Sequence, residues 1–403
     1  IDRYLDLLLE KYAAPELDLG TFNYKNKLDL LAAIAEYMVR HSNYHLVENL
    51  VVRFIADYLE AFGLEYSAAS IFEHLVGTKV LRRKDGLVNF RLRMFLEYFV
   101  AYRMQTDEIF RAYVFDPSRY VSFPNEIGLY CALSLKDDEK LLMVFEGYKQ
   151  VFNRVWLGKK SVDRGGEALD AFQLPAKDAQ LDQLDEFTLA TRTNEEISDE
   201  RLAILDDLEL EDNQSQEIQR YIPEDETSDW MAHLLLLSGM LKHLELVSNQ
   251  TKLDVLDSVI DGWLHFTHYS LGVMAQLAKS KRLQINGVTY RSAFPEDMPE
   301  GEIARLLVTA MPVAAARMAS LSLATEKLAV QLRTNMGSAD EPASKSLFKF
   351  ALLVDLITSE IQRSGPIVLN KVSGSDFLSR AFALKLREIA VRYKLSDDAL
   401  GHV

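Results

Sequence analysis

Cysteine is almost missing from this sequence, whose 403 residues include only Cys131. A single cysteine cannot form a disulfide within the chain, and it cannot supply a cysteine-based zinc site. The apolar neighbours at positions 129–133 predict a buried, inert thiol, because catalytic thiols need an electropositive and partly exposed setting. The lack of a disulfide framework fits a reducing compartment, so we expect a cytoplasmic protein.

Long hydrophobic runs are also missing. No stretch approaches the roughly 18–20 apolar residues that cross a bilayer, and the richest candidate, residues 347–361, is interrupted by Lys349, Asp355 and Glu360. We therefore predict no transmembrane segment and no membrane partner. The sequence begins at Ile1 with neither Met nor a charged-then-apolar leader, so we expect no secretory signal and a true N-terminus that lies further upstream.

Common catalytic and nucleotide-binding motifs are absent as well. A phosphate-binding loop has the pattern Gly-x4-Gly-Lys-Ser/Thr after a strand, and no part of the sequence has it. The lysines and glycines of residues 159–166 stand in the wrong order, and this stretch is predicted to be a linker. No Ser-His-Asp, paired-carboxylate or metal-ligand spacing rises above chance. We predict no catalytic residue, no metal site and no cofactor within the chain.

Two histidines could suggest a metal site. His265 and His268 stand three positions apart on one helix face, but no third ligand follows at a matching spacing. The aromatic side chains of Trp263, Phe266 and Tyr269 surround them in sequence. This pattern favours a packed aromatic layer over metal binding.

Negative charge is concentrated in one segment. Residues 178–229 contain 18 acidic and 3 basic residues, so this segment accounts for the whole net charge of −15. Interleaved Leu, Ile and Phe residues argue against a purely solvated tail, and we expect helices or clamped loops here. The charge could meet a basic partner or a basic surface of the same protein, although a soluble carboxylate-rich face is the simpler interpretation.

The most informative stretch is residues 80–101. Asp85-Gly86 is flanked by Lys84 and by the apolar run from Leu87, and it predicts a hairpin, because Gly accepts the positive φ that tight turns require. A helix is predicted before it over residues 67–76 and another after it over 93–104, and further helices are predicted over 27–39 and 46–61. Three helices, a hairpin and a closing helix are the outline of a winged-helix unit.

Residues 90–101, Phe-Arg-Leu-Arg-Met-Phe-Leu-Glu-Tyr-Phe-Val-Ala, resemble the signature that closes the winged helix of STAND and NACHT signalling NTPases. The opening residues 1–12 look like the lid helix that leads into that domain. The resemblance covers about residues 1–150. It implies that a nucleotide-binding domain lies upstream, between an N-terminal effector and this region.

In that family the winged helix contacts the nucleotide site at rest and rotates away on activation. Some members carry a histidine where this sequence has Leu92, so a direct phosphate contact from this position is not expected. The resemblance makes Arg91, Arg93 and Glu97 candidate contacts to the nucleotide site or to another domain. Surface or salt-bridge partners are the simpler interpretation of the arginines. We expect Glu97 to be partly buried and paired with an arginine of the same unit.

A winged helix can also read DNA with its third helix. Residues 67–76 contain no Arg or Lys, whereas a base-reading helix presents Arg, Lys, Asn or Gln. Basic residues lie instead on the predicted hairpin, where they could contact phosphate or a partner. We call this set, Lys79, Arg82, Arg83 and Lys84, the basic wing.

We predict a mainly α fold, in which a winged-helix domain with a small β-hairpin is followed by an irregular helical array without a regular repeat. A second hairpin is predicted at Asn286-Gly287. The predicted parts are the end of a helical lid (1–21), the winged helix (22–104), a helical domain (105–177), the acidic segment (178–229) and a C-terminal helical sensor (230–403).

The resemblance implies the regulatory and sensor region of a STAND-type ATPase that oligomerises on ligand recognition, in antiphage or innate immune defence. ATP and Mg²⁺ would then bind the full-length protein. Its partners would be its own upstream NTPase and effector domains, a foreign protein or nucleic-acid trigger, and further copies of itself. Two alternatives remain open at this point: a free-standing helical interaction scaffold, and a winged-helix DNA-binding regulator.

Overall fold

The structure is a computed structural model, and it is mainly helical with a small three-stranded antiparallel sheet, as the sequence predicts. The description covers Leu5, Leu9, 22–156, 165–175, 220, 222–223, 225–280, 282–285, 288–291, 294, 298–323 and 325–393. The predicted lid helix, most of the linker at 159–166 and most of the acidic segment lie outside these residues. Contacts divide the chain into unit 1, residues 1–137 with 197–222, and unit 2, residues 138–196 with 223–403.

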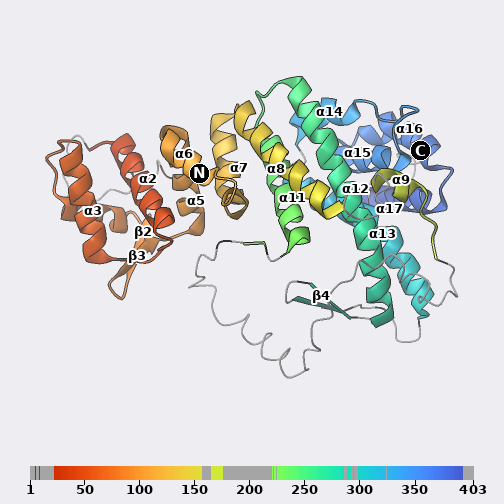
Figure 1. The fold of residues 1–403 in the computed structure, drawn as a ribbon, viewed down its shortest axis with the longest axis horizontal. Coiled ribbons are helices and arrows are strands. Elements are labelled where there is room, and N and C mark those ends of the chain that lie inside the picture. The colour runs from red at the N-terminus through yellow and green to blue at the C-terminus, as the bar shows by residue number, and fades with distance from the viewer. Residues whose placement is uncertain are drawn as a thin grey trace. The chain divides into compact units, whose positions relative to one another are not determined.

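Unit 1 begins with alternating helices and short strands, in the red and orange part of Figure 1. Its three strands form an antiparallel sheet in the order β1-β3-β2. The elements are α2 (Tyr24–Arg40), β1 (Leu46–Val47), α3 (Glu48–Ala61), α4 (Ala68–Gly77), β2 (Leu81–Lys84), β3 (Leu87–Phe90) and α5 (Arg93–Thr106).

The β2–β3 hairpin confirms the prediction from Asp85-Gly86. Both residues have positive φ, 54° and 76°, which matches the twist of a two-residue hairpin loop. The predicted helix over 46–61 is wrong at its start, because Leu46 and Val47 pair with Val88 and Leu87 of β3 before the helix begins.

The helices of unit 1 begin at recognisable caps and bury one face each. Asn23 accepts a hydrogen bond from Asn26 N at 3.1 Å at the start of α2, and Ser67 accepts one from Ser70 N at 3.2 Å at the start of α4. The predicted helix at 67–76 is thereby confirmed. The core contains Leu31, Ile34, Ile55, Phe72, Phe95 and Phe99, all at most 1% exposed.

Three further elements complete unit 1, namely α6 (Glu108–Val114), the 3-10 turn η2 (Tyr120–Ser122) and α7 (Pro124–Ser134). Asp107 caps α6 through Phe110 N at 2.8 Å. Helix α7 starts with a proline, which is suited to the first helical position. Helix α5 packs against both α2 and α7, so it occupies the middle of the unit.

Unit 2 is a helical array with one hairpin. The strands β4 and β5 pair antiparallel around Asn286-Gly287, which confirms the second predicted hairpin. Pro366 lies inside α16, which begins at Glu360 and continues with Val368 and Val372 buried on one face. The elements are α8 (Asp138–Trp156), α9 (Gly165–Asp170), α11 (Glu226–His243), α12 (Asn249–Ser280), β4 (Arg282–Ile285), β5 (Val288–Arg291), α13 (Glu300–Leu323), η5 (Glu326–Leu328), α14 (Ala329–Arg333), α15 (Ala343–Leu356), α16 (Glu360–Val372) and α17 (Asp376–Tyr393).

Among the described helices, α13 is long and apolar enough to cross a membrane by length and composition alone. It packs against α11, α12, α15 and α17. Its small residues Ala315, Ala316 and Ala319 are fully buried, which brings the neighbouring helices close. The contacts bury 39% of the apolar window of α13, and Leu306, Met318 and Leu321 remain exposed.

Candidate functional site

The turn between β3 and α5 presents an exposed group of residues, Arg91–Met94, which we call the α5 corner. Arg91 N donates to Val80 O at 3.0 Å, which fixes the turn on the hairpin. Leu92 is the N-cap of α5, and no side chain caps the helix there. Leu92 and Met94 are 41% and 42% exposed, whereas Phe95 is buried. The corner therefore presents two apolar side chains that alternate with two arginines.

Glu97 lies one turn further along α5, and its carboxylate is occupied. Arg93 Nε lies 2.9 Å from Glu97 Oε1, and Asn125 Nδ2 donates to the same oxygen at 2.8 Å. The Glu97 side chain is 12% exposed, while that of Arg93 is 51% exposed. The expectation of a partly buried Glu97 paired with an arginine is confirmed. Asn125 was not predicted, because nothing in the sequence near position 97 indicates it.

The three predicted contact residues therefore differ in availability. Arg93 remains half exposed but is held by Glu97, and Glu97 itself faces Arg93 and Asn125. Arg91 is exposed and makes no ion pair within the part of the chain that the structure describes. Arg91 is thus the residue of the three whose charge is most available to a ligand or to another domain.

The residues of the basic wing also differ in whether their charges are already paired. Arg83 bonds to Glu73 of α4 at 2.7 Å and to Glu48 of α3 at 3.0 Å, and its guanidinium lies 5.7 Å from the centre of the Phe72 ring. This arginine ties the hairpin to two helices. Within the described residues, no ion pair engages the other three members, Lys79, Arg82 and Lys84.

Helix α4, the third helix of the predicted winged helix, does not present a base-reading surface. Its exposed positions are Ala69, Glu73 and Gly77, and Glu73 pairs with Arg83. None of these can donate the hydrogen bonds by which Arg, Lys, Asn or Gln read base edges. A contact of α4 and its hairpin with nucleic acid would therefore come from the basic wing and would engage phosphate.

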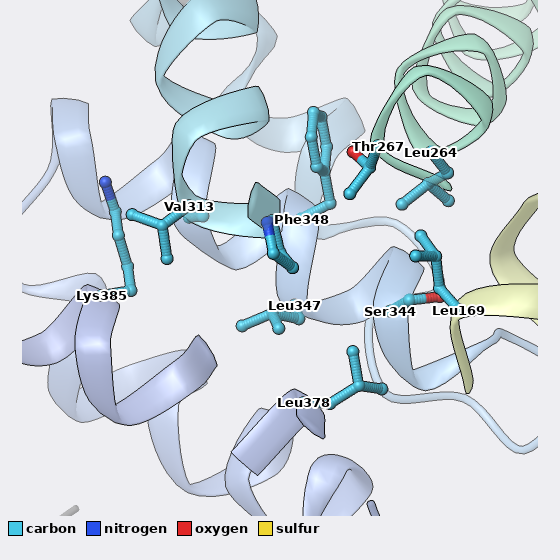
Figure 2. Close-up of a pocket in the computed structure, with 11 residues that line it drawn as sticks. Leu169, Leu264, Thr267, Val313, Ser344, Leu347, Phe348, Leu378 and Lys385 are labelled. Carbon is cyan, nitrogen blue, oxygen red and sulfur yellow. The ribbon is translucent and has the colours of Figure 1, made fainter. Parts of the chain in front are cut away.

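Unit 2 contains a small internal cavity between α9, α12, α13, α15 and α17 (Figure 2). Leu169, Leu347 and Leu378 are among the apolar side chains that line it. Its volume of about 10 Å³ leaves room for at most one water molecule. The cavity is therefore a packing defect and is too small for a substrate.

The histidines of unit 2 take part in packing. His265 Nε2 accepts a hydrogen bond from Gly165 N at 3.2 Å, and its Nδ1 lies 2.8 Å from Asp261 O. Burial lowers the pKa of His265 below its usual value. The rings of Phe152 and Trp156 lie 4.8 and 5.7 Å from the His265 ring, so His265 packs among aromatic rings, although these belong to α8 and not to the predicted set of Trp263, Phe266 and Tyr269. Among the described residues, no three His, Cys, Asp or Glu side chains form a group that could hold a metal ion.

Comparison with known proteins identifies one family. Residues 44–100 match the model of the family Novel STAND NTPase 4. The match runs from the residues just before β1 to the middle of α5, so unit 1 contains a STAND NTPase-related region. No curated protein and no solved structure matches the chain. Outside residues 44–100, the interpretation depends on the structure.

Proposed function

We propose that unit 1 contains the winged helix of a STAND-type ATPase and that this chain is the regulatory and sensor region of that protein. One observation carries the proposal: the residues that match the family, 44–100, coincide with β1, α3, α4, the β2–β3 hairpin and the start of α5. With α2 in front, the order is helix, strand, two helices, hairpin and closing helix. This order and the three-stranded antiparallel sheet are the features of a winged helix.

The α5 corner is the part of this winged helix that would contact the upstream nucleotide-binding domain in the resting state. Leu92 and Met94 supply exposed apolar area, and Arg91 supplies a charge that is not engaged within the described residues. The Leu92 side chain has no group that can hydrogen-bond to a phosphate, so its contribution is packing. Arg91 can pair with a phosphate or with a carboxylate of the neighbouring domain.

The remaining parts of the proposal follow from the family. ATP and Mg²⁺ bind the full-length protein upstream of this chain, and exchange of the nucleotide releases the winged helix. The helical array of unit 2 acts as the sensor for a foreign protein or nucleic acid, and the activated protein assembles with further copies of itself. The setting is cytoplasmic antiphage or innate immune defence.

The test uses the native protein, purified with its own upstream sequence, and measures its mass distribution by mass photometry in ADP and in ATP with Mg²⁺. We expect larger assemblies in ATP than in ADP. The double variant Leu92→Glu/Met94→Glu should assemble in ATP more readily than the unchanged protein, because two carboxylates at the α5 corner weaken the resting contact. Ile109→Glu is the matched control, since Ile109 is an exposed apolar residue on α6 of the same unit, 76% exposed.

Three outcomes would count against the proposal. A fixed mass in every nucleotide, with no nucleotide bound, would favour a free-standing helical scaffold. A gene without a P-loop domain upstream would lead to the same conclusion. Equal behaviour of Leu92→Glu/Met94→Glu and Ile109→Glu would contradict the role of the α5 corner while leaving the family assignment in place.

A further inference from the structure

Arg220, one of the 3 basic residues of the acidic segment, lies in a pocket of unit 1. Its guanidinium carbon is 4.0 Å from the centre of the Phe123 ring and 5.5 Å from that of the Tyr44 ring. Nε donates to Tyr44 Oη at 2.9 Å, and Nη1 donates to the carboxylate of Glu126. Nη1 also lies 3.4 Å from Ser122 O. The guanidinium therefore contacts two aromatic faces, a hydroxyl, a carbonyl and a carboxylate.

The walls of this pocket belong to the packed part of unit 1. Tyr44 lies just before β1, Phe123 precedes α7, and Glu126 is in the first turn of α7. Tyr44 is 9% exposed, Phe123 6% and Glu126 2%. Arg220 is 94 residues away from Glu126 in the sequence. The pocket is thus formed by one part of the chain, and its occupant comes from another.

The chemistry of the pocket suits a guanidinium group. Burial raises the pKa of the Glu126 carboxyl, Arg220 opposes this shift, and the nearby carboxylate of Glu97 adds to it. A buried carboxylate needs a cationic partner. A flat guanidinium can hydrogen-bond in its plane while its faces contact aromatic rings, which an ammonium group cannot do.

Arg220 does not use all of its hydrogen-bond donors in the pocket. The Nη2 atom of Arg220 is buried and has no hydrogen-bond partner within the described residues. A buried unpaired donor costs free energy and makes the bound state less favourable. The contact is therefore better suited to a reversible latch than to a permanent clamp. The chain passes from unit 1 into unit 2 directly after Ile222, two residues beyond Arg220.

We propose that Tyr44, Phe123 and Glu126 form a guanidinium-binding pocket and that Arg220 occupies it as a latch from the same chain. The latch holds residue 220 on unit 1, two residues before the chain passes into unit 2. This proposal does not depend on nucleotide binding or on the proposed STAND function.

The test measures chymotryptic cleavage after Tyr221, which follows Arg220 directly, by mass spectrometry of the 403-residue chain. Arg220→Ala should raise the cleavage rate at least about tenfold, since hydrogen bonds to charged groups contribute about 1.5–3 kcal/mol and cleavage follows the population of the released state. Arg119→Ala is the matched control, because Arg119 also lies over an aromatic ring of unit 1, 4.3 Å from the centre of Tyr113, but outside the pocket.

Direct binding then separates a guanidinium pocket from an ordinary structural ion pair. Free ethylguanidinium has no link to the chain, so it should leave the cleavage of Arg220→Ala unchanged, but it should slow hydrogen exchange at the α7 amides of this variant, whereas ethylammonium at equal ionic strength should not. This protection should be lost in Arg220→Ala/Glu126→Gln, which has no carboxylate in the pocket, and circular dichroism would establish that this variant is folded. Unchanged cleavage in Arg220→Ala would overturn the latch, and a failure of ethylguanidinium to protect α7 in the folded Arg220→Ala would overturn the guanidinium pocket.

Discussion

His74 of α4 is expected to make unit 1 sensitive to mild acid. Its side chain is buried, with 3% exposed, and its Nε2 atom has no hydrogen-bond partner in the described part of the chain. Burial lowers the pKa of His74 from 6.5 to about 4, and the nearby ammonium of Lys27 lowers it further, while the Leu9 carbonyl acts in the opposite direction. The folded state therefore holds the neutral imidazole.

The sign and size of the effect follow from linkage. A histidine whose pKa is lower in the folded than in the unfolded state contributes its full stability above pH 6.5 and loses it as the pH falls toward 4. A shift from 6.5 to about 4 corresponds to about 3 kcal/mol in total, of which about 2 kcal/mol would be lost by pH 5. His74→Phe removes the titrating group and keeps a ring of similar shape.

The assay must report on unit 1 alone. All three tryptophans, Trp156, Trp230 and Trp263, lie in unit 2, so their fluorescence follows that unit. Hydrogen exchange of the α4 amides, corrected for the intrinsic pH dependence of exchange, reports local opening of unit 1. At pH 5 we expect the free energy of opening of α4 to be higher in His74→Phe than in the unchanged protein. This difference between the two proteins should exceed their difference at pH 7.5 by about 2 kcal/mol.

Two comparisons make this prediction refutable. His45→Gln changes an exposed histidine next to β1 and should leave the acid dependence of α4 exchange unchanged. In unit 2, burial also lowers the pKa values of His243 and His265, so tryptophan fluorescence should keep its own acid dependence in His74→Phe. The reasoning would be refuted if the difference in the free energy of opening between His74→Phe and the unchanged protein stayed constant within about 0.5 kcal/mol from pH 7.5 to 5. Linkage requires this difference to change by about 2 kcal/mol.

Two further predictions concern the stability of unit 2, measured by urea unfolding with tryptophan fluorescence. Gly262→Ala should destabilise unit 2 by about 1–3 kcal/mol, because the added Cβ would lie 2.3 Å from Tyr148 Oη. In Gly239→Ala the added Cβ meets nothing within 4 Å, so this variant should stabilise unit 2 by up to about 1 kcal/mol. Equal effects of the two would contradict the packing. Lys349→Met should cost about 3–5 kcal/mol, because it leaves the Glu341 carboxylate buried without its cation, and Lys349→Met/Glu341→Gln should recover much of the loss. A double variant as unstable as Lys349→Met would refute this explanation.

The elements that the sequence predicts correctly are those with local signals. The turn at Asp85-Gly86, the Ser67 cap and the turn at Asn286-Gly287 each depend on residues within three or four positions, and the structure contains the expected hairpins and helix. The pairing of Glu97 with Arg93 is also local, since the two residues are four positions apart on one helix. Such contacts need no knowledge of the fold.

The features that the sequence does not predict depend on distant partners. Leu46 and Val47 form a strand because Leu87 and Val88 lie beside them, which no pattern near position 46 indicates. The Arg220 pocket joins positions as far as 176 residues apart. A weak signal existed for Arg220, because an isolated cation in a strongly acidic segment is a candidate for a specific ion pair. Its partner Glu126 could not be identified from the sequence.

The close approach of α9 to α12 explains two patterns that each suggest chemistry when they are considered alone. Gly165-Gly166 after two lysines looks like part of a phosphate loop, and His265 with His268 looks like part of a metal site. In the structure a Cβ at Gly165 would lie 2.7 Å from His265 Nδ1, and the Gly165 N–H donates to His265 Nε2. Glycine is required at position 165 because the His265 imidazole lies against its backbone. Both nitrogens of the imidazole form hydrogen bonds within unit 2, so the ring has no free lone pair for a metal. One contact between α9 and α12 thus accounts for both patterns.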